Sequence, residues 1–174
     1  DHAESTVKHL YNHPCICQWT IFNEGWGQFD SDWVTREFWK WDHSRLIDSC
    51  SGWFAQRENP MESLHIYFKP VTLRRCRKPI AVTEFGGFVY KIREHSLSRG
   101  KTYGYGKCKT REDFGKMFLE LYEKQIVPAT PKGLCAAIYT QLTDVENECN
   151  GLLTYDRQVC KVDEEPMCRL AEKL

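Results

Sequence analysis

Two glutamates, Glu24 and Glu84, close short apolar segments and could do acid–base chemistry together. Glu24 ends the run ICQWTIFNE, Glu84 ends the run PIAVTE, and glycines follow each within a few residues. Glycine lets the backbone turn sharply and leaves room beside a carboxylate. Two such carboxylates at the ends of strands could hydrolyse a glycoside, one as general acid and the other as nucleophile. The alternative is two unrelated glutamates that form salt bridges with neighbours such as Arg36 or Arg93.

A sheet must hold these carboxylates, and the hydrophobic pattern predicts one. Short apolar runs predict strands at 15–22, 47–54, 64–68, 79–85 and 133–142. Amphipathic patterns predict helices at 3–12, 30–46, 110–127 and 163–174, with Asp30 or Ser31 capping the second and Thr110 the third. A long polar loop is expected at 90–109. Strands that alternate with helices or long connections are typical of a parallel sheet in a single α/β domain, here spanning 1–174.

Other polar and aromatic side chains stand at or just beyond strand ends. They are Asn23, Trp26, Trp53, His65, Tyr67, Gln141, Asp144 and Glu146. In a (β/α)8 barrel the chemistry lies at the carboxyl ends of the strands, so these groups are candidates for the same site. Trp19 stands inside its strand and is expected in the core.

Composition narrows the classes of function. Lys plus Arg is 24 and Asp plus Glu is 24, and this neutral balance argues against a nucleic-acid partner. No apolar run approaches the roughly 18 residues that a membrane span requires. The nine cysteines are scattered and mostly in apolar runs, which predicts reduced, packed thiols in a cytoplasmic protein. Cys15 and Cys17 are expected on one face of a strand. No Cys/His set has zinc-finger spacing, so no metal is expected.

The order of the motifs resembles the catalytic core of glycoside hydrolase family 2, which contains β-galactosidases, β-glucuronidases and β-mannosidases. The resemblance rests on WTIFNEGWGQ, PIAVTEFGG, the Asn12-His13-Pro14 turn, IDSCSGWF and YTQLTDVENECNGLLTYDR, and runs from about residue 8 to 165. The last segment is similar to the bacterial β-galactosidase-like subgroup. The resemblance implies a partial (β/α)8 TIM barrel, strands four to eight with their helices, cut from the C-terminal part of a longer barrel.

The same resemblance implies a role for each candidate residue. Glu24 would be the general acid/base and Glu84 the nucleophile of a retaining β-glycoside hydrolase, with a β-linked oligosaccharide or glycoside as substrate and no cofactor. Asn23 would hydrogen-bond the 2-hydroxyl of the sugar. The other implied substrate-binding residues are Trp26, Trp53, His65, Tyr67, Gln141, Asp144 and Glu146.

Other functions remain open beside this interpretation. An opened barrel exposes unpaired strand edges, which predicts low stability or self-association through the open side. Truncation could also leave a non-catalytic carbohydrate-binding fragment. Another alternative is a β-glucuronidase, a β-mannosidase or another hydrolase of the same barrel clan. The last is a redox or metal protein built on the nine cysteines.

Overall fold

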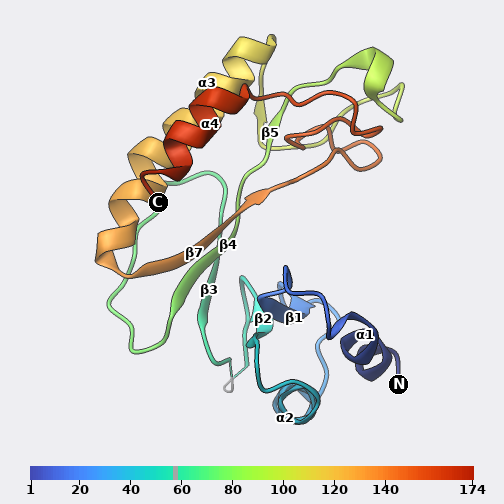
Figure 1. Ribbon diagram of the computed structural model, residues 1–174, viewed down its shortest axis with the longest axis vertical. Coiled ribbons are helices and arrows are strands. Elements are labelled where there is room, and N and C mark those ends of the chain that lie inside the picture. The colour runs from blue at the N-terminus through green and yellow to red at the C-terminus, as the bar shows by residue number, and fades with distance from the viewer. Residues whose placement is uncertain (57–58) are drawn as a thin grey trace. The chain divides into compact units, whose positions relative to one another are not determined.

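The chain forms two compact units. The computed structural model describes residues 1–56 and 59–174 (Figure 1). Unit 1 comprises Asp1–His65 and Arg75–Thr83, and unit 2 comprises Ile66–Arg74 and Glu84–Leu174. Two strands, β3 (Glu62–Ile66) and β4 (Ile80–Gly86), run from one unit into the other.

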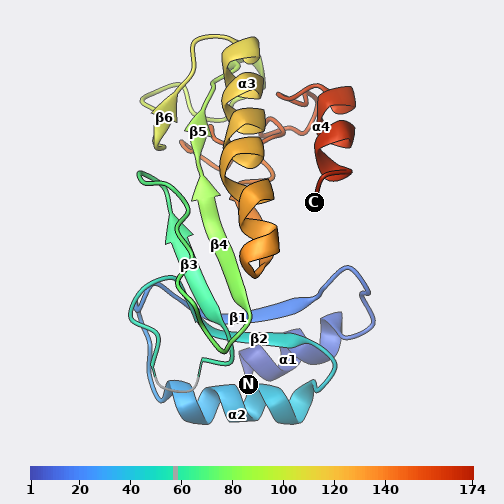
Figure 2. The same cartoon turned by 90° about the vertical axis from the view of Figure 1, so that its left-hand side faces the viewer.

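Unit 1 contains two αβ segments, each a helix followed by a strand. Its elements are α1 (His2–Leu10), β1 (Gln18–Asn23), α2 (Ser31–Trp41) and β2 (Leu46–Ser51), and both helices lie beside the β1–β2 pair (Figure 2). The two strands are parallel and in register, with Trp19 opposite Ile47 and Asn23 opposite Ser51. The core combines Val7 of α1, Trp19, Val34 and Phe38 of α2, and Ile47. The expectation that Trp19 is a core residue is therefore confirmed.

A buried polar cluster at the end of α2 fixes the start of β1. Asp42 accepts hydrogen bonds from Trp19 Nε1 at 2.8 Å and from Arg45 Nη1 at 2.8 Å. The same guanidinium donates to the carbonyls of Tyr11 at 2.6 Å and Ile16 at 2.8 Å. Burial acts to raise the pKa of Asp42, but these bonds and those from Ser44 outweigh it and hold the pKa well below its usual range. The ionised form of Asp42 is thus favoured by the fold.

The Asp42→Asn variant should lose stability at neutral pH and become less sensitive to acid. A lowered folded pKa contributes stability above the ordinary value of 3.8, and that stability is lost as the pH falls below it. We expect the variant to be about 1.5–3 kcal/mol less stable at pH 7, the scale of a charged hydrogen bond. Urea unfolding at pH 7 and pH 3 measures the gap, with the exposed Glu172→Gln as control. A gap that stays constant between the two pH values would contradict this assignment.

Unit 2 packs helices beside short strands. Its further elements are β5 (Phe88–Val89), η1 (Arg93–His95), β6 (Gly106–Lys107), α3 (Arg111–Leu121), the π-helical η2 (Tyr122–Ile126), η3 (Val127–Lys132), β7 (Leu134–Thr140) and α4 (Glu164–Ala171). The side chain of Thr110 accepts a hydrogen bond from the backbone of Asp113 at 3.0 Å, so its predicted capping role is confirmed. Aromatic edges meet in the core, with the rings of Phe118 and Tyr139 5.0 Å apart.

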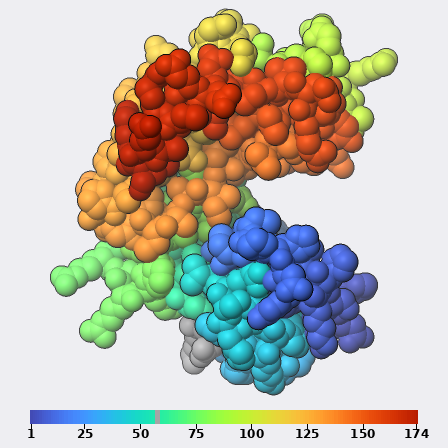
Figure 3. All heavy atoms as spheres, viewed as in Figure 1, coloured from blue at the N-terminus to red at the C-terminus, as the bar shows by residue number. Residues whose placement is uncertain are grey.

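Helix α4 lies against α3 in this unit, and the two segments are adjacent in Figures 1 and 3. Two exposed ion pairs flank this contact, one at the starts of the helices and one between η2 and the residues after α4. Arg111 lies 2.8 Å from Asp163, and Lys173 lies 2.6 Å from Glu123. Such exposed pairs add little free energy, so the packing of the helices rather than the charges holds α4 in place.

The expected partial TIM barrel is wrong. The described strands form three small sheets, β1-β2, β3-β4-β7 and β5-β6, and no barrel closes among the described residues. Between β2 and β3 the described contacts are side-chain hydrogen bonds, such as Ser63 Oγ to Asp48 at 2.7 Å, instead of a backbone ladder. A barrel requires every strand to pair along both edges. Self-association, which was expected through the open side of that barrel, stays a prediction.

Most of the predicted elements are present, and they are either shorter than expected or shifted by one or two residues. The strand expected from residue 15 begins at Gln18, so Cys15 and Cys17 precede it and do not share a strand face. The nine free cysteines are also less buried than expected, since only Cys50 and Cys149 are fully buried. Within the described ranges, no helix has the length and apolar character that a membrane span would require.

Candidate active site

Glu24 lies directly after β1, at the end of the β1–β2 ladder. Its backbone N–H donates to the carbonyl of Ser51 at 2.8 Å, so the ladder extends to this residue. The backbone of Glu24 has a φ of 51°, a left-handed conformation that a non-glycine residue rarely adopts. Its Oε1 lies 2.6 Å from Nδ1 of His65 in a hydrogen bond. The carboxylate is therefore fixed by backbone and side chain and is in reach of a proton-carrying group.

Asn23, the last residue of β1, is oriented by the neighbouring strand. Ser51 stands opposite it in the parallel register, and the hydroxyl of Ser51 donates to Asn23 Oδ1 at 2.8 Å. This bond fixes the orientation of the amide, whose NH2 group is a hydrogen-bond donor. An amide donor beside a carboxylate is suited to a sugar hydroxyl.

His65 is held in place by close packing with residues 52 and 53. The side chain of His65 is fully buried, and the ring of Trp53 meets it edge to face at 6.1 Å. Gly52 has a φ of +78°, and a Cβ at this position would lie 2.6 Å from His65 Nδ1. Only glycine fits here, because both the backbone conformation and the imidazole exclude a side chain.

The Gly52→Ala variant should displace His65 from Glu24. Gly27→Ala is the matched control, because Gly27 has a φ of +67° but nothing within 4 Å of its Cβ position. Both variants carry the left-handed cost of about 1–2 kcal/mol. The Gly52 variant adds an overpacking cost of about 1–3 kcal/mol. Urea unfolding of the two variants gives the difference, and equal stability would show that the imidazole is not fixed as described.

A buried polar network supports the strand that carries His65. Asp48 accepts hydrogen bonds from Ser63 Oγ at 2.7 Å and from Asn59 Nδ2 at 3.0 Å, and the Ser63 and Thr83 hydroxyls lie 2.6 Å apart. Burial raises the pKa of Asp48 against the opposing effect of these donors. The sequence reasoning missed this network. Its only signal was the run of small polar residues within segments otherwise typical of buried strands.

Glu84 belongs to unit 2, where Tyr67 contacts it. The phenol of Tyr67 donates to Glu84 Oε2 at 2.6 Å and lies 3.0 Å from the hydroxyl of Thr140 on β7. Burial, followed by the hydrogen bond to Glu84, raises the pKa of Tyr67 far above its ordinary value. Tyr67 therefore remains a neutral hydrogen-bond donor to Glu84 at physiological pH.

Tyr67 is itself held by an aromatic stack. Its ring lies parallel to that of Tyr105 with centroids 3.8 Å apart. Gly87, with a φ of +66°, permits this approach, since a Cβ there would lie 2.6 Å from the Tyr105 ring. The glycines after Glu84 therefore serve close packing in unit 2.

The three residues predicted after the last strand occupy different environments. Gln141 donates from Nε2 to Asn150 Oδ1 at 2.8 Å and to Glu148 at 3.3 Å. Asp144 is buried and accepts from Lys161 Nζ at 2.6 Å, which gives it an internal partner. Glu146 is exposed and has a φ of 51°.

Trp26 and Trp53 contribute to an exposed aromatic surface in unit 1. Trp26 is 81% exposed, Phe54 is 79% exposed and Trp53 is 51% exposed. Phe54 is fixed by its carbonyl, which accepts from Gln28 Nε2 at 3.1 Å. Flat aromatic faces suit the apolar faces of sugars, so these rings are candidates for contact with a carbohydrate.

Thus the structure brings Glu24, Asn23, His65 and Trp53 together in unit 1, and Glu84 and Tyr67 together in unit 2. Comparisons with known proteins do not assign the chain to a family. No protein-family model matches the sequence, and no curated protein shows significant similarity to it. Function must therefore be argued from the residues themselves.

Proposed function

We propose that this chain carries the two catalytic carboxylates of a retaining β-glycoside hydrolase of the β-galactosidase-like kind. The observation that carries the proposal is shared by both glutamates. Each follows or ends an apolar strand segment, and each lies 2.6 Å from a proton-carrying side chain, His65 for Glu24 and Tyr67 for Glu84. The resemblance of both flanking motifs to glycoside hydrolase family 2 supports the same assignment.

The proposed reaction has two steps. The Glu84 carboxylate attacks the anomeric carbon, the bond to the leaving oxygen breaks, and the Glu24 carboxyl transfers its proton to that oxygen. The Glu24 carboxylate then removes a proton from water, and this water attacks the anomeric carbon and releases Glu84. The two inversions give net retention, and the reaction uses no cofactor because the carboxylates and water supply every proton and electron pair.

Positioning residues complete this mechanism. Tyr67 holds the side chain of the proposed nucleophile in position through its short hydrogen bond to Glu84. His65 orients Glu24 through the hydrogen bond between them. The imidazole and the carboxyl group can share the proton of this bond as Glu24 changes between acid and base. Asn23, with its oxygen bonded to Ser51, would donate to the 2-hydroxyl of the sugar, a contact that strengthens in the transition state.

A carbohydrate-binding protein without turnover is the second candidate. The exposed Trp26, Trp53 and Phe54 favour it, because stacked aromatic rings bind sugars without any catalytic group. Both candidates take a β-linked glycoside as partner, and they differ only in whether a bond is broken. Among hydrolases, β-glucuronidase and β-mannosidase are the alternatives to β-galactosidase.

The test is an assay of the full-length protein against nitrophenyl β-galactoside, β-glucuronide and β-mannoside. Cleavage of one of them, with the β-anomer of the sugar as the first product by NMR, is the expected result. Release of the α-anomer would exclude the retaining mechanism. Binding of a sugar without cleavage of any substrate would favour the second candidate.

A further inference from the structure

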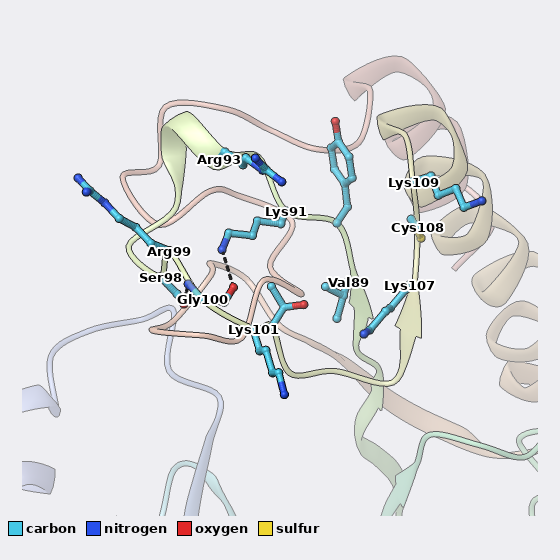
Figure 4. Close-up of a pocket in the computed structure, with 12 residues that line it drawn as sticks. Val89, Lys91, Arg93, Ser98, Arg99, Gly100, Lys101, Lys107, Cys108 and Lys109 are labelled. Atoms are coloured by element: carbon cyan, nitrogen blue, oxygen red, sulfur yellow. Dashed lines mark hydrogen bonds between the residues drawn. The ribbon is translucent and has the colours of Figure 1, made fainter.

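A strongly basic cavity in unit 2 plays no part in the proposed reaction. It is open to solvent and has a volume of about 890 Å³ between β5, the segment that follows β5, and the residues around β6 (Figure 4). Six of its lining residues are cationic and none is acidic. The cationic residues are Lys91, Arg93, Arg99, Lys101, Lys107 and Lys109.

This concentration of charge stands out in a neutral chain. The whole chain has 24 basic and 24 acidic residues, whereas residues 88–109 contain six Lys or Arg and a single acid, Glu94. None of the six cations takes part in an ion pair with another residue that the structure describes. Like charges gathered around a concave space repel one another, and a bound anion relieves that repulsion.

The cavity walls are fixed by backbone contacts. Strands β5 and β6 are parallel, with Val89 opposite Lys107, and the N–H of Cys108 donates to the carbonyl of Val89 at 2.8 Å. Lys91 Nζ donates to the carbonyl of Gly100 at 3.1 Å and so ties the loop to the strand. The positions of the cations therefore rest on a defined frame rather than on a free loop.

The side chains divide into two groups in Figure 4. Those of Lys91, Arg93 and Lys107 point toward the space of the cavity, whereas those of Arg99 and Lys109 point away from it. Lys91 and Arg93 follow β5, and Lys107 lies on the paired strand β6. The hydroxyl residues Ser98 and Thr102 also line the cavity and can donate hydrogen bonds to oxyanions. The arrangement offers donors on several sides of one ligand.

We propose that this cavity binds a small molecule that carries two or more phosphate or sulfate groups. Lysine and arginine bind these oxyanions through charge-assisted hydrogen bonds. More than one anionic group is expected because six cations and no acidic residue line the cavity, and a single group would neutralise few of them. The volume lies within the range of about 300–1,000 Å³ typical of small-molecule sites. A nucleic acid would require an extended basic surface, and the chain as a whole is neutral.

Calorimetric titration of the full chain with inorganic triphosphate tests the proposal. In about 25 mM salt, where screening is weak, triphosphate should bind at least about tenfold more tightly than inorganic phosphate, since one further charged hydrogen bond is worth that factor. Sucrose octasulfate in place of triphosphate distinguishes a sulfated from a phosphorylated ligand. Saturable binding of either supports the proposal.

The variant pair separates a site from general attraction. Arg93→Gln with Lys107→Gln should weaken binding by about tenfold or more. Lys69→Gln with Arg74→Gln removes the same charge from exposed positions outside the cavity and should change affinity less than about twofold. Equal losses in the two double variants, or no binding of either polyanion to the unmodified protein, would overturn the proposal. Circular dichroism of all variants confirms that each is folded.

Discussion

The Glu84→Gln variant of the full-length protein should lose β-glycoside hydrolysis by about 10⁴-fold or more in kcat, the scale seen when a catalytic nucleophile is removed. The amide is nearly isosteric and can still accept the hydrogen bond that Tyr67 donates at 2.6 Å, so the fold should persist. The loss follows because an amide oxygen cannot form the glycosyl ester. Initial rates on the cleaved nitrophenyl glycoside measure it, with the exposed Glu62→Gln as control.

The Glu24→Gln variant should distinguish the two carboxylates. A nitrophenolate leaves without a proton, whereas an alkyl alcohol requires one, so the first step should be slowed far more for an alkyl glycoside. The loss on the alkyl substrate should be about 10²–10⁴-fold, the usual contribution of a general acid. Azide, which attacks without a general base, should restore turnover of the nitrophenyl substrate. An equal loss on both substrates would contradict the acid/base assignment.

The Lys161→Met variant should be the most destabilised of the single changes. Lys161 is completely buried, and its Nζ lies 2.6 Å from Asp144 and 3.1 Å from the carbonyl of Cys149. Burial lowers the pKa of Lys161, and burial raises the pKa of Asp144, because each charge has lost its water. Removal of one partner leaves the other charge buried and uncompensated, which costs about 3–5 kcal/mol.

A double-mutant cycle with Asp144→Asn tests that explanation. The double variant should be less destabilised than the sum of the two single changes, since it leaves no unpaired charge. Lys173→Met, which breaks an exposed pair with Glu123, should cost less than about 1 kcal/mol and serves as control. Additive single changes would mean that the pair is not coupled. If the cycle shows coupling, the role of Asp144 is structural, and activity of its variants should decline with the folded fraction and leave KM unchanged.

Most helices and strands could be predicted because their signals, hydrophobic spacing and capping residues, come from residues that are close together in the sequence. The three- and four-residue spacing of Phe114, Met117, Phe118 and Leu121 predicted α3, and Thr110 was identified as its cap from residue type alone. Both candidate carboxylates, Glu24 and Glu84, were identified because each stands at the end of an apolar run. The start of β1 was placed too early because Arg45, far along the chain, bonds the carbonyls of Tyr11 and Ile16.

The failures have a common physical cause, which is dependence on contacts between distant residues. Five apolar runs are compatible with a barrel, but they do not determine which strand edges pair. The link between β2 and β3 depends on Asp48, Asn59 and Ser63, whose buried bonds leave no periodic signal. The basic cavity was interpreted as a polar loop, because the β5–β6 pairing that gathers its cations involves only two residues of each strand.

Trapping of the covalent intermediate tests the central claim most directly. A 2-deoxy-2-fluoro β-glycoside of the cleaved sugar, with a good leaving group, slows the second step more than it slows ester formation. We predict that the protein gains the mass of one fluorosugar and that peptide mapping places it on Glu84, with no label in the Glu84→Gln variant. Turnover of the natural glycoside without any label, or a label on another residue, would contradict the assignment of Glu84 as nucleophile.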